Sequence, residues 1–316
     1  MTRVASIDCG TNSIRLLVTD VPAGGAHTDL LRRMEVVRLG QGVDATGRLA
    51  PEAIERTRRV LAEYAAQARE LGATAVRMVA TSATRDAANR TDFEDMVSST
   101  LGQLPDVVTG REEAELSFLG ATASLDAAAA AHGSPPPRPP FLVVDIGGGS
   151  TEFVLGDAAG VRAARSVDIG CVRLTERHLH GDPPTGGEVA RAEADIRAAL
   201  GDVRAEVPVD DAATLIGLAG SVTTVAALVL ELPKYDADAI HGSRIAVDGV
   251  RGVTADLLAA SRSRRAAMPV MHPGRVDVIG GGSLILRVLM DEFGLPDVVV
   301  SEHDILDGIA LRLARS

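Results

Sequence analysis

The chain alternates between two hydrophobic patterns. Short runs rich in Val, Ile and Leu, at residues 4–7 and 14–21, are typical of strands. Longer segments repeat their apolar positions every three or four residues, and residues 51–71 are the clearest case, which predicts an amphipathic helix. Pro51 suits the first position of that helix, and Gly72 suits the position after its end. Strands that alternate with helices predict the α/β class.

The same patterns continue along the chain. They predict strands at residues 76–80 and 107–109, and helices from about residue 92 and from residue 111. The last of these helices leads into the proline-rich residues 133–140, which we expect to form an exposed, stiff connection. A chain of 316 residues is long enough for two domains, so we place the domain change near this connection, with the preceding helix as the bridge.

One hairpin pattern occurs twice. Residues 6–13 (SIDCGTNS) align without a gap with residues 143–150 (VVDIGGGS), and an apolar strand follows each turn. Asp, Gly and Ser fall at matching places in the two segments. A repeat of this spacing predicts two domains related by duplication, each of which begins with the same hairpin.

The two turns have the composition of an oxyanion cradle, because Gly lets backbone amides approach a ligand and Ser or Thr hydroxyls add donors. For either turn alone, Asp-x-Gly is ordinary turn chemistry. Two matched copies favour a function, with the turns facing each other across a cleft. The candidate phosphate-binding residues of the two turns are Gly10, Thr11, Asn12, Ser13, Gly147, Gly148, Gly149, Ser150 and Thr151.

Two further glycine-rich segments have the same character. Residues 214–221 (TLIGLAGS) predict a strand that leads into a helix at residues 222–232, so Gly220 and Ser221 would lie at an N-terminus that attracts anions. Residues 276–283 (VDVIGGGS) predict a glycine turn before a helix at residues 284–293. Neither segment matches a dinucleotide-binding or Walker A motif.

Composition narrows the class of partner. There are 32 Lys and Arg against 43 Asp and Glu, so the net charge is −11, and aromatic residues make up 2% with no Trp. These values argue against a protein that coats DNA, RNA or an anionic membrane. Two cysteines, no long apolar stretch and no signal-peptide pattern lead us to expect a cytoplasmic protein without a membrane-spanning helix.

Four motifs occur in an order that resembles one family. They are DCGTNS at residues 8–13, ATSATRDAAN at 80–89, GREEA at 110–114 and DIGGGSTE at 145–152, and GLAGS at 217–221 and RVDVI at 275–279 fit later motifs. Together they resemble the exopolyphosphatase and guanosine pentaphosphate phosphohydrolase (Ppx/GppA) family. The resemblance implies two ribonuclease-H-like domains of the actin, Hsp70 and sugar-kinase superfold that flank a cleft. It places domain I at residues 1–124, domain II at 125–298, and a C-terminal helix that returns to domain I at 299–316.

The resemblance also implies catalytic roles. It makes Glu113 the general base for the attacking water, although acids at a helix start are usually explained by the helix dipole. It gives Arg85, otherwise an ordinary loop arginine beside Asp86, a phosphate contact. Asp145, Glu152 and Asp8 are the expected ligands of Mg²⁺, for which hard oxygen donors are suitable. Arg173 is a weaker candidate.

The leading hypothesis is a Mg²⁺-dependent exopolyphosphatase that hydrolyses the terminal phosphoanhydride of inorganic polyphosphate. Short chains are the expected substrates, because longer relatives carry a helical region after the one C-terminal helix seen here. The alternatives are a guanosine pentaphosphate 5′-phosphohydrolase, a kinase or ATPase of the same superfold that seats adenosine on residues 280–282, and a sensor without catalysis. A homodimer is inferred from the family alone.

Overall fold

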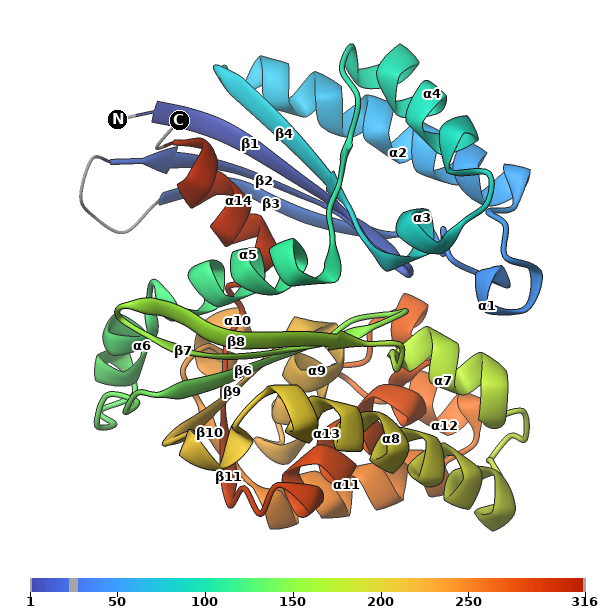
Figure 1. Ribbon diagram of the computed structural model, residues 1–316, viewed down its shortest axis with the longest axis vertical. Coiled ribbons are helices and arrows are strands. Elements are labelled where there is room, and N and C mark those ends of the chain that lie inside the picture. Colours follow the sequence, from blue (N-terminus) through green and yellow to red (C-terminus); the bar gives the residue numbers. More distant parts are fainter. Residues whose placement is uncertain (1, 23–27, 315–316) are drawn as a thin grey trace. The chain divides into compact units, whose positions relative to one another are not determined.

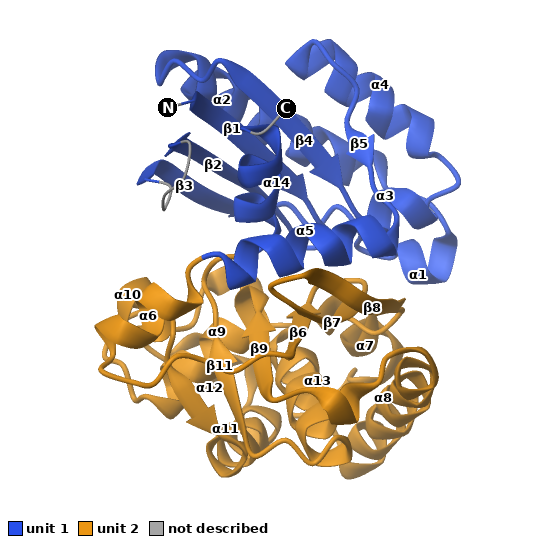
Figure 2. Ribbon diagram, turned by 60° about the vertical axis from the view of Figure 1, so that its left-hand side comes forward, with its two compact units in different colours: residues 1–123, 304–316 blue, residues 124–303 orange. Residues whose placement is uncertain are grey.

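The computed structural model describes residues 2–22 and 28–314, and these form two compact units (Figures 1 and 2). Unit 1 consists of Met1–Ala123 and Asp304–Ser316, and unit 2 of Ser124–His303. The chain therefore passes from one unit to the other after Ala123 and again after His303. The helix expected as a bridge lies wholly in unit 1, and residues 299–303 belong to unit 2.

Among its described residues, unit 1 contains one sheet with the strand order β3-β2-β1-β4-β5. The first three strands are antiparallel, and β4 and β5 are parallel to β1. The strands are β1 (Thr2–Cys9), β2 (Ser13–Val21), β3 (Thr28–Val36), β4 (Ala75–Ala80) and β5 (Asp106–Val107). The helices are α1 (Val43–Thr46), α2 (Pro51–Glu70), α3 (Ser82–Asp86), α4 (Arg90–Leu101), α5 (Gly110–Thr122) and α14 (Ile305–Leu313).

Alternate residues of β1 and β2 pack on opposite faces of this sheet, as the period of two requires. Ala5, Ile7 and Cys9 join a core with α2 and α4, where Tyr64 and Phe93 are fully buried. The other face packs on α5 and α14; in Figure 1, α14 crosses in front of the strands and α5 lies below it. Asp8 and Arg15 alternate with the core residues and therefore belong to the face that α14 covers.

The sheet of unit 2, within the described part of the chain, has the order β10-β11-β9-β6-β7-β8. Its strands are β6 (Phe141–Ile146), β7 (Thr151–Asp157), β8 (Gly160–Val167), β9 (Thr214–Leu218), β10 (Arg244–Ala246) and β11 (Asp297–Val300). Its helices are α6 (Leu125–Ala131), α7 (Cys171–His178), α8 (Gly186–Glu206), α9 (Ala219–Val229), α10 (Ala237–Ile240), α11 (Val247–Ala259), α12 (Arg262–Ala266) and α13 (Ile279–Glu292). Leu142, Phe153 and Leu289 belong to its core.

The two sheets share one topology. Strands β8-β7-β6-β9-β11 of unit 2 correspond in order and direction to β3-β2-β1-β4-β5 of unit 1, and β10 adds one antiparallel strand. The predicted α/β class and the predicted repetition of the hairpin are confirmed. No helix in the described ranges is both long and apolar enough to cross a membrane.

Three boundaries differ from the sequence prediction. Thr109 is not in a strand: it caps α5, since its hydroxyl accepts a hydrogen bond from the Glu112 amide at 3.2 Å. Helix α9 begins at Ala219 rather than residue 222, so Gly220 and Ser221 lie inside its first turn. Residues 280–282, expected to form a glycine turn, are the first turn of α13.

Candidate functional site

The turn between β1 and β2 is held from two sides in unit 1. The Gly10 amide closes it by donating to the Ser13 carbonyl oxygen at 3.0 Å. The Thr11 hydroxyl shares a hydrogen bond of 3.0 Å with the Ser82 hydroxyl at the start of α3. The Asn12 carbonyl oxygen accepts from the amides that follow β3, including that of Arg38 at 2.8 Å. The four residues predicted to cradle phosphate therefore form one rigid turn.

Asp8 lies directly opposite Arg15 in the antiparallel register of β1 and β2. The Arg15 Nη2 and Nε atoms donate to Asp8 Oδ2 at 2.6 and 3.0 Å, and the Arg15 guanidinium also pairs with Asp304. Only 3% of Asp8 is exposed, and its Oδ1 atom has no hydrogen-bond partner within the described residues. Burial raises the pKa of the Asp8 carboxyl above its ordinary value, and Arg15 opposes that rise.

Glu113 is in the first turn of α5, next to the residue that completes its capping box. Because Thr109 and Glu112 cap the helix reciprocally, Glu113 is left for another role. Its Oε2 atom accepts a hydrogen bond of 3.0 Å from Arg85 Nη1, and that nitrogen also donates to the Val108 carbonyl oxygen at 3.1 Å. The Glu113 carboxylate is thus buried and held by a guanidinium.

Helix α3 connects these two parts of unit 1. Ser82 at its start contacts Thr11, and Arg85 near its end contacts Glu113. The sequence prediction of a loop around Arg85 is therefore wrong, because the segment is a short helix. The pairing with Asp86 weighed from the sequence is present as well, at 3.8 Å from Arg85 Nε.

The turn between β6 and β7 of unit 2 repeats the first turn. The Gly147 amide donates to the Ser150 carbonyl oxygen at 3.0 Å, the same bond and length as in unit 1. The amides of Cys171 and Val172 at the start of α7 donate to the carbonyl oxygens of Gly147 and Gly148 at 2.9 Å. The Thr151 hydroxyl donates to a backbone oxygen, that of Ile169, so it is engaged in holding the turn.

Asp145 and Glu152 lie directly opposite each other in the β6–β7 register, so both side chains are on one face of the sheet. They are 7% and 1% exposed, and the Ser166 hydroxyl donates to Glu152 Oε1 at 2.7 Å. Carboxylates on one face of neighbouring strands supply hard oxygen donors, the ligand type that Mg²⁺ takes in proteins. A complete metal cage of three or more acidic, His or Cys side chains is not found in the part of the chain described.

Gly220 and Ser221, in the first turn of α9, are packed against other groups of unit 2. A Cβ atom at Gly220 would overlap the Arg275 guanidinium, whose Nη1 atom donates to the Thr224 hydroxyl at 3.0 Å. Sequence reasoning did not single out this arginine, and the only signal for it is its place in the segment RVDVI. Ser221 hydrogen-bonds to Cys171, which opposes the effect of burial that raises the pKa of that thiol.

The glycines of α13 serve close packing rather than a loop. A Cβ atom at Gly281 would lie 2.8 Å from the Thr175 Oγ1 atom, and one at Gly282 would overlap the Ser221 hydroxyl. Of the residues expected to seat adenosine, Gly281 and Gly282 therefore lie on a helix surface packed against α7 and α9, and a Cβ atom at Gly280 would lie 3.4 Å from Leu258 of α11.

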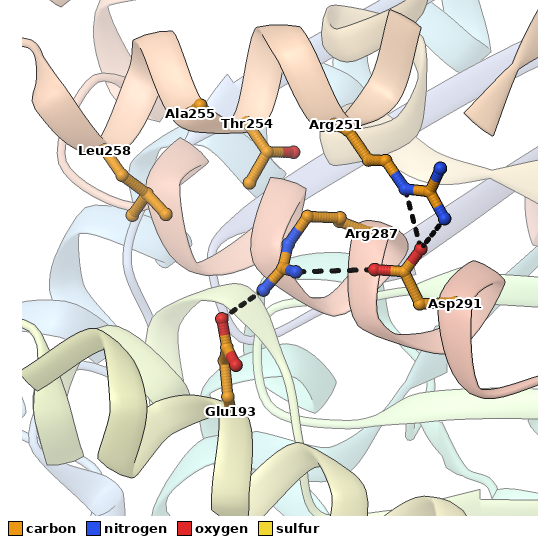
Figure 3. Close-up of a pocket in the computed structure, with 7 residues that line it drawn as sticks. All are labelled: Glu193, Arg251, Thr254, Ala255, Leu258, Arg287 and Asp291. Atoms are coloured by element: carbon orange, nitrogen blue, oxygen red, sulfur yellow. Dashed lines mark hydrogen bonds and ion pairs between the residues drawn. The ribbon is translucent and has the colours of Figure 1, made fainter. Parts of the chain in front are cut away.

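Other candidates have local partners. Arg173 lies 3.5 Å from Asp168, and His178 lies 2.9 Å from Asp195. A pocket of about 330 Å³ opens between α8, α11 and α13 (Figure 3), and its lining contains none of the predicted site residues. Its charged groups already form a chain of ion pairs, in which Arg287 joins Glu193 to Asp291 and Arg251 also binds Asp291. We assign no role to this pocket.

Comparisons with known proteins identify the family and similar folds. The profile of the Ppx/GppA phosphatase family matches residues 17–316. Exopolyphosphatase 2 of Mycobacterium tuberculosis is 52% identical over 99% of both chains. The crystal structure of an exopolyphosphatase-like protein has a TM-score of 0.92 at 40% identity, covering 98% of this chain and 97% of the other. The Aquifex aeolicus Ppx/GppA enzyme has a TM-score of 0.80 at 31% identity, covering 98% and 99%.

Proposed function

Because this chain belongs to the Ppx/GppA phosphatase family and is therefore a hydrolase, we propose that it is a Mg²⁺-dependent exopolyphosphatase. Its reaction would hydrolyse the terminal phosphoanhydride of inorganic polyphosphate and release orthophosphate. The name of the relative at 52% identity supports the substrate. The observation that carries the chemistry is the buried acid pair of Asp145 and Glu152 beside a glycine turn.

In the proposed reaction, Glu113 orients a water molecule and accepts its proton as the water oxygen bonds to the terminal phosphorus. The bridging oxygen leaves with the shortened chain and takes the electron pair of the broken P–O bond. Arg85 fixes the carboxylate of Glu113 and offers its guanidinium to phosphate oxygens. The two glycine turns present backbone amides to the same kind of oxygen.

Asp145 and Glu152 would hold Mg²⁺ in unit 2. Asp8 of unit 1, the third ligand expected from the sequence, has its Oδ2 atom bonded to Arg15. When bound, Mg²⁺ supplies charge neutralisation on the phosphate oxygens. A preference for short chains, a homodimer and a cytoplasmic location remain predictions from the sequence.

The experiment is a measurement of phosphate release from purified protein on short and long polyphosphates, guanosine pentaphosphate and ATP, with and without Mg²⁺. We expect orthophosphate from polyphosphate only when Mg²⁺ is present. Faster turnover of guanosine pentaphosphate would assign the alternative substrate of the family. Transfer of phosphate to an acceptor would indicate a kinase, and tight binding without turnover would indicate a sensor.

The assignment of Glu152 as a Mg²⁺ ligand can be tested with a separate variant. Glu152→Gln should raise the Mg²⁺ concentration needed for half-maximal activity, because one carboxylate of the pair becomes neutral. Asp157→Asn is the matched control, since Asp157 ends the same strand and pairs with Arg162. An unchanged Mg²⁺ dependence in Glu152→Gln would remove Glu152 from the proposed metal site.

A further inference from the structure

Arg15 lies between two buried carboxylates in unit 1. It binds Asp8 on the neighbouring strand and Asp304 at the start of α14, and these acids are 3% and 6% exposed. Asp304 has little freedom, because its Oδ1 atom accepts a hydrogen bond of 3.0 Å from the Leu306 amide as the cap of α14. One guanidinium therefore neutralises two fixed acids.

The surrounding elements hold this cluster in place. Arg32 on β3 pairs with Asp307, the other member of the α14 capping box, at 2.5 Å. Asp307 is fully buried, and its second oxygen accepts from the Asp304 amide at 2.8 Å. Strands β2 and β3 are thus each tied to the first turn of α14 by an arginine, and the Arg15 cluster cannot relax by moving α14 away.

The duplicated hairpin of unit 2 offers the comparison. Glu152 stands where unit 1 has Arg15, opposite Asp145 where unit 1 has Asp8. The second hairpin therefore pairs an acid with an acid, whereas the first pairs an acid with an arginine. Asp8 also keeps one buried oxygen, Oδ1, without a hydrogen-bond partner in the described ranges, so Arg15 uses only one of its two carboxylate oxygens.

We propose that the Arg15 guanidinium occupies a place between Asp8 and Asp304 in unit 1 that a divalent metal ion would fill if Arg15 were absent. Removal of its charge leaves three oxygens for a hard cation: both oxygens of Asp8 and the Asp304 oxygen that now binds Arg15. Arg15 acts as a positioning residue. It holds Asp8 and offsets the charge of two acids beside the turn of residues 10–13, where an anion is to bind.

The test counts metal ions and needs no substrate. Mn²⁺ binding is measured by isothermal titration calorimetry and by electron paramagnetic resonance. We expect one more Mn²⁺ site per chain in Arg15→Gln than in the wild type. Arg15→Lys keeps a cation and should show the wild-type number. Arg15→Gln with Asp304→Asn should lose the additional site. An equal Mn²⁺ count in wild type and Arg15→Gln would overturn the proposal.

Thermal unfolding gives a second readout that does not require a fully stable variant. Mg²⁺ should raise the unfolding temperature of Arg15→Gln more than that of the wild type or of Arg15→Lys. No added stabilisation by Mg²⁺ would count against the proposal even if Arg15→Gln folds only in part.

A consequence for activity rests on the proposed function. In Arg15→Gln, the KM for polyphosphate should rise more than kcat falls at low Mg²⁺, and high Mg²⁺ should reverse the rise. The double variant with Asp304→Asn should not be rescued in this way. A defect confined to kcat, or equal rescue of both variants, would contradict the positioning role while leaving the metal count and the hydrolase assignment intact.

Discussion

At the scale of single residues, Glu113 is the group on which the proposed hydrolysis depends most. Glu113→Gln keeps the size of the side chain and an oxygen that can accept from Arg85, but the amide cannot take a proton. We expect kcat for phosphate release to fall by roughly 10²–10⁴-fold, the usual contribution of a general base. Steady-state phosphate release at saturating polyphosphate measures it.

The neighbouring Glu112 provides the matched control. It is exposed on the same helical turn and only caps α5 through Thr109. Glu112→Gln retains an acceptor for the cap, so its kcat should stay at the wild-type value. If the two variants lost activity equally, the effect would come from the helix start rather than from Glu113 as a base.

At the scale of elements, a close crossing of α5 and α14 holds the helix that carries Glu113. A Cβ atom at Gly308 would overlap the Leu116 carbonyl oxygen, and one at Gly120 would overlap that of Asp304. We expect Gly308→Ala to lower the free energy of unfolding by about 1–3 kcal/mol, because the two backbones must separate. Denaturant unfolding measures the change.

Gly201→Ala tests the same substitution where space is open. Gly201 is in the interior of α8, and a Cβ atom there would meet nothing within 4 Å. This variant should be more stable than the wild type by about 0.5–1 kcal/mol, since Gly costs entropy in a helix. Destabilisation of the same size in both variants would show that the crossing imposes no special restriction.

Glu188, at the start of α8, should make the stability of the folded protein depend on pH. Glu188 accepts hydrogen bonds from the amides of His180, Gly181 and Thr185, at 2.7–3.1 Å, and from the Thr185 hydroxyl. These bonds lower the pKa of Glu188 from 4.5 to about 2. A lowered pKa gives stability that is present above the ordinary value and is lost as the pH falls toward about 2.

We therefore expect Glu188→Gln to be less stable than the wild type at neutral pH, with a difference that shrinks as the pH falls below 4.5. Asp202→Asn, on the exposed side of the same helix, should follow the wild type throughout. Unfolding curves across the acid range measure both. A Glu188→Gln difference that stays constant with pH would contradict the assignment.

The hairpins could be predicted because short-range chemistry specifies them: the apolar strands, the Asp-x-Gly turns and their repetition are all local. The third strands of the two antiparallel sets, β3 and β8, are mostly partly buried and carry no continuous apolar run, so no pattern indicated them. Gly281 and Gly282 of α13 were predicted to lie in a turn, because their close contacts with α7 and α9 are visible only in the packed structure.

The identities of several site residues could be predicted from local sequence, whereas the contacts between them could not. Asp8, Glu113, Asp145 and Glu152 could be proposed from motifs. The links between them could not, because Arg85 meets Glu113 across 28 positions and Arg15 meets Asp304 across 289. Continuing the gap-free alignment of the two hairpins by two residues places Arg15 against Glu152. The second acid bound by Arg15, Asp304, comes from the far end of the chain and could not be inferred from that alignment.

At the scale of the whole molecule, the net charge of −11 does not by itself argue against binding of a polyanion such as polyphosphate. Arginines across both units are paired locally with acids, as in Arg58 with Glu55 and Arg251 with Asp291. The exposed pairs add little stability and little net local field. Binding of polyphosphate would therefore depend on the local groups of the two turns rather than on the sum over the surface.

In the proposed reaction, water attacks the terminal phosphorus of a polyphosphate chain. Hydrolysis of inorganic tripolyphosphate in H₂¹⁸O with Mg²⁺, followed by mass spectrometry of both products, tests it most directly. We expect the label in the released orthophosphate and none in pyrophosphate, and Glu113→Gln should give roughly 10²–10⁴-fold less product in the same time. Label in pyrophosphate would mean attack on the central phosphorus, and unlabelled products would mean transfer to a group other than water; either result would contradict the account.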